Sequence, residues 1–243
     1  MLATGSAPTV SLTSTILHPE HGYRARAAPS RRNGLEDHLG HVTLRGIEAK
    51  KHIFIEGDKK DFVYVVVSGA VCLYKVLPDG RRQVIDFAYP GDLIGLGSGA
   101  IETLNAQATV ATRIRCTSLG ALRQAASRDP ALALRLYEAL SRELATMRDH
   151  LIRVGQRSAM ERVTSFLLAL SKRNEARARD PLTVEMPMTR SDIGDFLGMT
   201  IETVSRTFSK LKFLGAIEID QGTIIRLVDT NQLQALADGE CGH

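Results

Sequence analysis

Short apolar runs with a period of two follow one another from residue 41 to residue 115. Turn residues such as Glu56-Gly57-Asp58 and Pro90-Gly91-Asp92 separate them. Asp79-Gly80 stands between two of the runs, which is a strong β-hairpin signal. The runs cover residues 41–44, 51–55, 62–67, 71–76 and 82–87, with a weaker alternation at 106–115. Several short strands at regular spacing predict a small antiparallel barrel or roll.

The apolar period changes to 3.6 after Pro130, and no glycine follows until Gly155. A long helix is therefore expected from residue 131. Its apolar stripe advances in steps of four and three, through Leu140, Leu144, Met147, Leu151 and Val154. This stripe can pack on the chain's own barrel or on the same helix of a second chain. Charged residues on both sides of the stripe favour the second arrangement, a homodimer interface.

Two shorter helices joined by a tight turn are predicted within residues 189–211. Thr189, followed three residues later by Asp192, is a suitable N-cap for the first of them. Gly194 leaves room for a second helix to approach closely, and Gly198 suits the left-handed conformation that ends a helix. This is the pattern of a helix-turn-helix.

The second helix of the pair has an apolar face and a polar face. Thr200 is its expected N-cap, with Thr203 three residues on. Its buried side consists of Val204, Phe208 and Leu211. A helix of that phase turns a different set outward near its N-terminus, namely Ile201, Glu202, Ser205 and Arg206. The N-terminal part of a recognition helix is the part that reaches base edges in the major groove.

The chemistry of the outward set suits base reading. Arg206 can donate two hydrogen bonds to guanine, and Glu202 can accept one from the amino group of cytosine. Ser205 can bond to either kind of partner, and Ile201 can touch a thymine methyl group. The alternative is a solvated surface with a Glu–Arg pair four residues apart. The complete two-helix pattern favours DNA reading, and phosphate contacts are assigned to Thr189, Arg190, Thr200, Thr203 and Lys210.

A predicted hairpin follows, with strands at 217–219 and 223–227 on either side of Asp220-Gln221-Gly222. It makes the motif a winged helix-turn-helix. The expected fold class is α+β, with an antiparallel β-roll, a long dimerisation helix and a C-terminal winged helix-turn-helix. The expected parts are a flexible arm (1–33), the roll (34–125), the dimerisation helix (126–157), the DNA-binding domain (158–229) and a tail (230–243).

Composition and charge agree with this organisation. The chain is 44% hydrophobic and 24% charged, as in ordinary globular proteins. Its net charge is +4, and residues 142–212 carry thirteen Lys and Arg against nine Asp and Glu. A basic excess around the predicted reader suits a phosphate backbone. No apolar run reaches the length of a membrane span, so no membrane partner is expected.

The three cysteines, Cys72, Cys116 and Cys241, form no CxxC pair, so zinc and iron–sulfur sites have no local signature. Cys72 and Cys116 are expected to act as small buried hydrophobic residues. The acid-poor first 33 residues faintly resemble a transit peptide, but a flexible or loosely docked arm is the preferred interpretation. A reduced, cytoplasmic protein is expected.

The chain resembles the Crp/Fnr family, that of the cyclic-AMP receptor protein and the anaerobic regulator Fnr. The resemblance covers roughly residues 40–230 and is most specific at 188–208. There, Glu202-Thr203-Val204-Ser205-Arg206 matches the E-x-x-S-R reader of the Fnr branch, and residues 158–163 match the start of the preceding helix. The resemblance implies a homodimer that binds a double-stranded palindrome with TTGA-type half-sites, in which Arg206 reads the guanine. It also implies RNA polymerase as a partner.

The sensor domain departs from both well-known relatives. Residues 1–71 contain no cysteine, whereas the Fnr type holds an iron–sulfur cluster with N-terminal cysteines. The cyclic-AMP type binds phosphate with a Gly-Glu turn and an Arg-Ser pair, and the corresponding stretches here are Gly91-Asp92-Leu93 and Ala106-Gln107-Ala108. The arginine that would neutralise the phosphate is missing. No cofactor is therefore expected.

An Fnr-like reader without cofactor ligands resembles the FixK branch, whose members are typically activators of microaerobic, denitrification or nitrogen-fixation genes. The leading hypothesis is thus an activator that needs no small effector. The alternative is the same fold gated by an unidentified ligand or by haem, for which His41, His52 and His150 are the available histidines. An enzyme is not expected, because the roll lacks a His/Glu metal cluster and a nucleophile–base pair.

Overall fold

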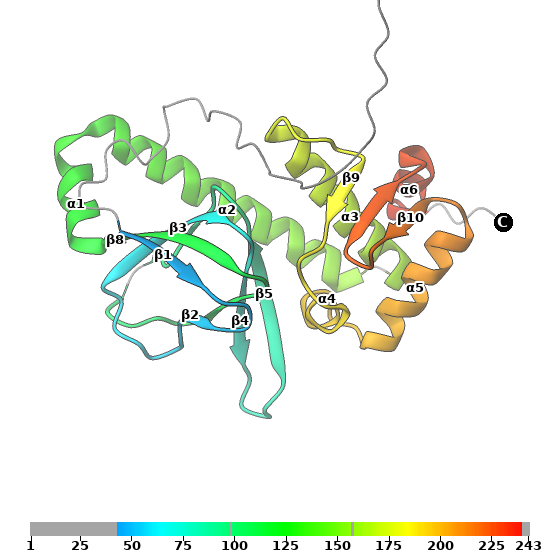
Figure 1. Ribbon diagram of the computed structural model, residues 1–243, viewed down its shortest axis with the longest axis horizontal. Coiled ribbons are helices and arrows are strands. Elements are labelled where there is room, and N and C mark those ends of the chain that lie inside the picture. Colours follow the sequence, from blue (N-terminus) through cyan, green and yellow to red (C-terminus); the bar gives the residue numbers. More distant parts are fainter. Residues whose placement is uncertain (1–42, 98, 157, 240–243) are drawn as a thin grey trace, which may run out of the picture. The chain divides into compact units, whose positions relative to one another are not determined.

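The computed structural model describes residues 43–239 except residues 98 and 157 (Figure 1). The strands are β1 Thr43–Ile47, β2 His52–Phe54, β3 Phe62–Ser68, β4 Val71–Val76, β5 Arg82–Ala88, β6 Leu93–Ile94, β7 Asn105–Ala108, β8 Thr112–Ser118, β9 Thr183–Glu185, β10 Ile217–Asp220 and β11 Ile224–Leu227. The helices are α1 Leu119–Arg128, α2 Pro130–Gln156, α3 Ala159–Ala176, α4 Arg190–Leu197, α5 Ile201–Phe213 and α6 Thr230–Ala237. The predicted arm at 1–33 lies outside the described residues.

The first eight strands form the predicted antiparallel roll. One sheet has the order β1-β8-β3-β6 and the other β2-β7-β4-β5. Inward side chains of both sheets make a compact core that includes Phe54, Val66, Val71, Ala106 and Ile114. The Asp79-Gly80 hairpin joins β4 to β5 as expected, with Gly80 at φ 82°. The α+β fold class is confirmed.

Three details of the roll differ from the prediction. The weak alternation at 106–115 is two strands, β7 and β8, because the chain turns between them where Thr112 Oγ1 donates to Ala70 O at 3.1 Å. The two-residue strand β6 was not predicted. Helix α1 was not predicted either, and it packs Leu119 and Leu122 beside Leu132 of α2.

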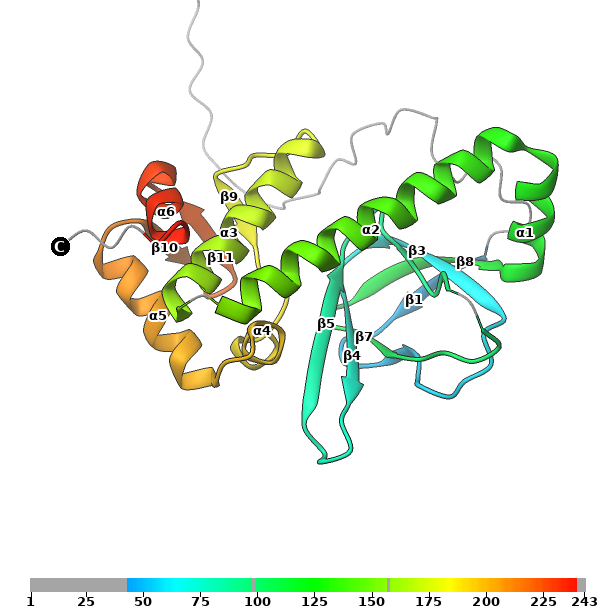
Figure 2. The same cartoon turned by 180° about the vertical axis from the view of Figure 1, so that it is seen from behind.

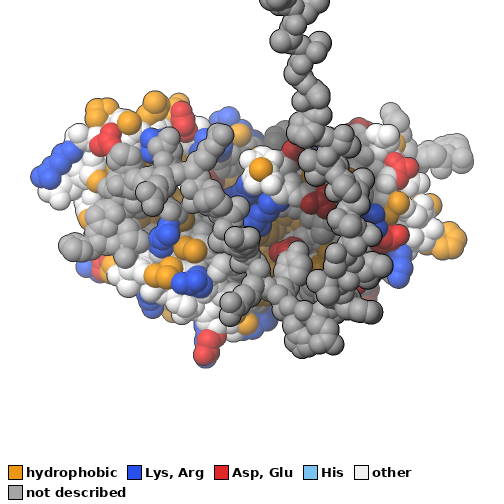
Figure 3. Space-filling view, turned by 45° about the horizontal axis from the view of Figure 1, so that its top comes forward, with side chains coloured by type: hydrophobic (Ala, Val, Ile, Leu, Met, Phe, Trp, Pro, Cys, Tyr) orange, Lys and Arg blue, Asp and Glu red, His pale blue; other side chains and the backbone are white. Residues whose placement is uncertain are grey.

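Helix α2 begins at Pro130, where a missing N–H costs nothing because the first turn of a helix has no partner for it (Figure 2). Asp129 Oδ1 accepts hydrogen bonds from the backbone of Ala131 and Leu132. Beyond Leu132, large apolar side chains on α2 are exposed: Leu134, Tyr137, Leu140, Leu144 and Met147. Figure 3 shows exposed hydrophobic side chains among charged ones at the upper left edge of the molecule. The side chains of Leu151 and Val154 lie outside the described residues.

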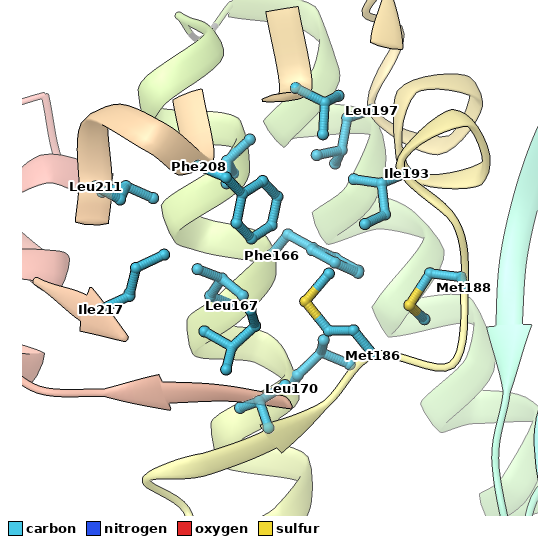
Figure 4. Packing of buried hydrophobic residues seen from close by; sticks show 14 of the residues in the cluster. Phe166, Leu167, Leu170, Met186, Met188, Ile193, Leu197, Phe208, Leu211 and Ile217 are labelled. Atoms are coloured by element: carbon cyan, nitrogen blue, oxygen red, sulfur yellow. The ribbon is translucent and has the colours of Figure 1, made fainter. Parts of the chain in front are cut away.

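The C-terminal domain packs four helices, α3 to α6, and a small sheet around one core (Figure 4). The sheet has the order β10-β11-β9. Phe166 of α3 lies among side chains of α4, α5 and the segment before α4, as Figure 4 shows with Ile193, Phe208 and Met186. These contacts hold the two helices of the helix-turn-helix against α3.

The tail expected from residue 230 is wrong in part, because Thr230–Ala237 form helix α6. Asp229 caps it by accepting a hydrogen bond from Gln232 N at 2.8 Å. Leu233 is fully buried in the C-terminal core. The local signal for this helix was an N-cap aspartate followed by apolar residues four apart. The helix has only eight residues, so this pattern is too short to be distinctive. Cys241 lies outside the described residues.

Candidate nucleic-acid interface

The first helix of the predicted pair, α4, starts at a complete capping box. Thr189 Oγ1 accepts a hydrogen bond from Asp192 N at 3.1 Å, and Asp192 Oδ2 accepts one from Thr189 N at 2.9 Å. Asp192 is buried. Burial opposes ionisation of this carboxyl, but hydrogen bonds from Arg82 and Thr189 outweigh it and lower its pKa. The expected N-cap is confirmed, and its acid also has a partner in the roll.

The turn between α4 and α5 uses both special glycines. Gly198 has φ 66° and ψ 45°, the left-handed conformation that favours glycine. A Cβ atom on Gly194 would lie 2.7 Å from Met199 O, closer than real Cβ contacts allow. Both glycines therefore act as predicted. The absence of a side chain at Gly194 thus lets the start of α5 pack directly against α4.

Arg162 of α3 also stabilises this turn, and the sequence analysis missed it. Its Nη1 atom donates to Leu197 O at 3.0 Å and to Gly198 O at 3.3 Å. These carbonyl groups end α4, where intrahelical partners are missing. The Arg162 side chain thus caps the C-terminus of α4 from a neighbouring helix.

The second helix, α5, has the predicted cap and the predicted buried side. Thr200 Oγ1 accepts a hydrogen bond from Thr203 N at 3.3 Å. Val204, Phe208 and Leu211 are buried in the core. The phase of α5 is therefore set by its apolar residues, and the opposite face is left to solvent.

That opposite face carries the four predicted base-reading residues: Ile201, Glu202, Ser205 and Arg206 are all exposed. Ile201 remains 46% exposed although it is a large apolar residue. Hydrogen bonds from its own backbone N–H and from the Thr200 hydroxyl lower the pKa of Glu202, which keeps it an ionised hydrogen-bond acceptor. The face thus presents an acceptor, a hydroxyl, a guanidinium and an apolar side chain to the same surface.

The residues predicted to contact phosphates lie in different settings. The hydroxyl groups of Thr189 and Thr200 already cap helices. The guanidinium of Arg190 stacks on the ring of Phe208 at 3.7 Å, and burial lowers its pKa. Thr203 lies beside Thr200, whereas Lys210 is exposed in the last turn of α5. Phosphate contacts by these residues stay predictions.

The predicted wing is present. Strands β10 and β11 pair antiparallel, with Ile219 opposite Ile225. Gln221 and Gly222, at φ 46° and φ 73°, form the tight turn between them. Strand β9 adds to the free edge of β11. Buried side chains of this sheet, Val184, Ile217 and Ile225, belong to the same core as those of α3 and α5.

In the two stretches of the roll that correspond to a nucleotide site, the side chains contact other parts of the protein or are buried. Asp92 forms ion pairs with Arg173 of α3 and with Arg177, the residue that follows the last turn of this helix. Ala106 and Ala108 are fully buried, and Gln107 donates to Lys50 O at 2.9 Å. No arginine stands in this stretch, and its inward positions are filled by methyl groups.

In the roll, the described histidine contacts another side chain of the protein, and the two cysteines are buried. His52 Nε2 is hydrogen-bonded to the Tyr74 hydroxyl at 2.8 Å. Cys72 and Cys116 are free thiols and buried, as predicted. Among the described residues, no group of three or more His, Cys, Asp or Glu is placed to hold a metal ion. Nor does the described part of the chain contain a helix long and apolar enough to cross a membrane.

Comparison with known proteins agrees with both domains. Residues 44–129 match the model of the cyclic nucleotide-binding domain, and residues 161–236 match that of the Crp-like helix-turn-helix domain. The chain is 42% identical to the nitrogen fixation regulation protein FixK of Bradyrhizobium diazoefficiens, over 76% of this chain and 78% of the relative. It is 38% identical to the transcriptional activatory protein AadR of Rhodopseudomonas palustris, over 77% of this chain and 78% of the relative.

A solved structure shows the same arrangement of elements. The structure of FixK2 from Bradyrhizobium japonicum superposes with a TM-score of 0.75 at 37% identity, and it covers 81% of this chain and 97% of that one. The chain therefore belongs to the Crp/Fnr family of DNA-binding transcription regulators, and within that family to the FixK-like branch.

Proposed function

We propose that this protein is a homodimeric activator that binds a TTGA-type palindrome without a small effector. The observation that carries the proposal is the exposed face of α5, where Glu202, Ser205 and Arg206 stand together at the start of a capped, rigidly held helix. An ionised acceptor and a guanidinium one helical turn apart can pair with a cytosine and a guanine. Two such faces, one from each protomer, would read the two halves of a palindrome.

The dimer is supported by α2. The predicted seam residues Leu140, Leu144 and Met147 are 40% to 49% exposed, and Tyr137 and Leu134 extend the stripe toward the N-terminus of the helix. A single chain gains nothing from a row of exposed apolar side chains on one helix, whereas a second copy would bury both rows. Charged neighbours such as Arg142 and Arg148 would lie at the rim.

The regulated genes are proposed from the relatives. FixK proteins are nitrogen fixation regulators by name, and AadR is named a transcriptional activatory protein. We place this protein in the control of microaerobic or nitrogen-related genes in the cytoplasm, with RNA polymerase as its partner. The filled interior of the roll near Ala106 and Ala108 supports control through the amount of protein rather than through a bound nucleotide.

A selection from a random pool of DNA tests the proposal. The purified full-length protein, with no ligand added, is expected to enrich a palindrome with TTGA-like half-sites. Recovery of sequences with no shared motif would contradict sequence reading. Recovery of single half-sites would contradict binding as a dimer.

A second candidate, gating of the same fold by a nucleotide, is favoured by the match of residues 44–129 to the cyclic nucleotide-binding domain. A gel shift on the selected palindrome with and without cyclic AMP distinguishes the two. Strict dependence on the nucleotide would establish the second candidate, and equal binding in both conditions would support the first.

A further inference from the structure

Arg82, the first residue of β5, connects the roll to the reader. Its Nη1 atom lies 2.5 Å from Asp192 Oδ1 and 3.6 Å from Asp195 Oδ2, both on α4. The guanidinium also lies 4.2 Å above the ring of Tyr74, and its Nη2 atom is 3.1 Å from Cys72 Sγ. One side chain of the roll thus engages the capping box of the first reader helix.

The protonation states around Arg82 show which of these partners balances its positive charge. Burial raises the pKa of Cys72 to about 12, so this thiol is neutral at physiological pH. The positive charge is therefore balanced by the carboxylates of α4. Because Asp192 is buried and the side chain of Arg82 is only 27% exposed, the cost of desolvation offsets much of the attraction, and the main effect of the pair is on the placement of α4.

Two neighbouring contacts act on the same helix. Gln83 Nε2 donates to Asp195 O at 2.7 Å. The ring of Phe87 packs edge-on against Phe196, with 5.3 Å between the centroids. Strand β5 therefore holds α4 by an ion pair, a hydrogen bond and an aromatic contact along its length.

A second ionic contact reaches the reader domain from the turn after β5. Asp92 pairs with Arg173 and with Arg177 near the end of α3, the latter at 2.7 Å. Arg173 also lies over the ring of Tyr89, 4.5 Å from its centroid. The two ionic contacts thus reach different helices of the domain, α4 through Asp192 and α3 through Arg173.

We propose that Arg82 is a positioning residue for DNA reading: by holding Asp192, it sets the orientation of the α4–α5 unit relative to the roll. Since the start of α5 packs closely against α4 at Gly194, the position of α4 determines that of the base-reading face. This inference rests on the proposed dimer, in which the roll and α2 connect the two readers. Arg82 would then determine the distance between the two base-reading faces, and hence the half-site spacing that the protein accepts.

The test compares Arg82→Ala with Arg81→Ala in the full-length protein. Arg81 is the adjacent residue of the same hairpin, is largely exposed and pairs with Asp79 of that hairpin at 2.7 Å. Both variants remove one positive charge. Affinity is measured for the selected palindrome and for the same palindrome with one base pair inserted in the spacer. The ratio of the two affinities reports how strictly the spacing is enforced.

Arg82→Ala is expected to lower this ratio by at least about threefold. Such a change corresponds to only part of the free energy that a hydrogen bond to a charged group contributes. Arg81→Ala is expected to leave the ratio unchanged. Arg82→Lys keeps the positive charge but concentrates it on a single ammonium group. It should therefore restore part of the affinity ratio that Arg82→Ala loses. Asp92→Asn, which weakens the second contact, should also lower the ratio.

An unchanged ratio in Arg82→Ala, with thermal unfolding showing a folded protein, would overturn the proposal. So would an equal, spacing-independent loss in Arg82→Ala and Arg81→Ala, because that would indicate only a lost charge near DNA. If Arg82→Ala does not fold, Arg82→Gln gives the same measurement with a neutral donor. If the wild-type protein selects no palindrome, the proposed function fails; if it does and only the ratios are equal, the positioning role alone fails.

Discussion

The reader and the roll place their charged side chains in different ways. On α5, Glu202 and Arg206 point outward and are free to meet another molecule. In the roll, Arg82 and Asp92 point toward the reader domain and are paired there, while the inward positions are closed by residues such as Ala106. The reader has a surface for recognition, and the roll has contacts for support. A sensor fold can thus persist as a scaffold when its charged residues serve the neighbouring domain.

The largest effect is expected from substitutions in the proposed dimer interface on α2. Leu144→Asp combined with Met147→Asp would place two carboxylates in the proposed interface, so monomers are expected. Because each monomer contacts one half-site, affinity for the palindrome should fall by about a hundredfold or more. Sedimentation velocity and gel shift check this.

Leu182→Asp is the matched control for the seam, since Leu182 is also an exposed leucine but lies outside α2. It should remain dimeric. A Leu144/Met147 double variant that stays dimeric would move the interface to another surface.

Gly194→Ala tests the rigidity of the reader. The added Cβ would meet Met199 O at 2.7 Å, so α4 and α5 must separate. A loss of about 2–3 kcal/mol in the free energy of unfolding is expected, as for other overpacked sites. Chemical denaturation measures it.

Gly120→Ala is the control for Gly194→Ala, because Gly120 lies in α1 and a Cβ there meets nothing closer than 3.6 Å. It should be neutral or should stabilise by about 0.5–1 kcal/mol. Equal effects at the two glycines would mean that the turn has more room than its geometry indicates.

Arg206→Ala sharpens the distinction between base reading and phosphate contact. A loss of about 1–3 kcal/mol in binding is expected, with relaxed preference at one base pair. Lys210→Ala, on the same helix, should weaken binding equally on all sequences and reduce the salt slope by about one. Binding to a set of single-base variants at several salt concentrations separates these outcomes. If Arg206→Ala lost the same affinity on every sequence, Arg206 would contact only phosphate and would not read a base.

The smallest expected effect concerns acid and the contact between Arg82 and Asp192. The pKa of Asp192 is lowered in the folded protein, so its contribution to stability is present above the ordinary value of about 3.9 and is lost as pH falls through the lowered pKa. Arg82→Ala should therefore be less stable than wild type at pH 7, by on the order of 1 kcal/mol, because Arg82 is partly exposed to solvent. The difference should shrink below about pH 4.

Thermal unfolding between pH 7 and pH 3 checks this, with Arg81→Ala as the control. A stability difference that stays constant down to pH 3 would show that Asp192 is not the group that Arg82 serves.

Much of the fold was predictable because it depends on local signals. Caps at Thr189 and Thr200, the special glycines Gly194 and Gly198, and the 3.6 period of α5 each act within a few residues. Of the elements that were missed, α6 has eight residues and β6 has two, whereas α1 begins in the segment that was assigned to the roll. Their existence depends on partners far away in the chain, as Leu233 of α6 depends on α3.

The candidate site divides in the same way. The face with Glu202, Ser205 and Arg206 was predicted because the buried side of the same helix determines its phase. Arg162 was missed, since an arginine that caps another helix looks like any charged residue on a helix surface. The stacking of Arg190 on Phe208 was missed for a similar reason.

The sequence by itself determined that this protein carries a winged helix-turn-helix and which residues of α5 face outward, because capping, glycine conformation and helical period are local properties. Only the tertiary structure decided what the charged residues of the roll do. Arg82 and Asp192 are 110 residues apart in the chain, and Asp92 and Arg177 are 85 apart. Such pairs arise when two folded domains meet, and a charged residue carries no mark of its partner until they do.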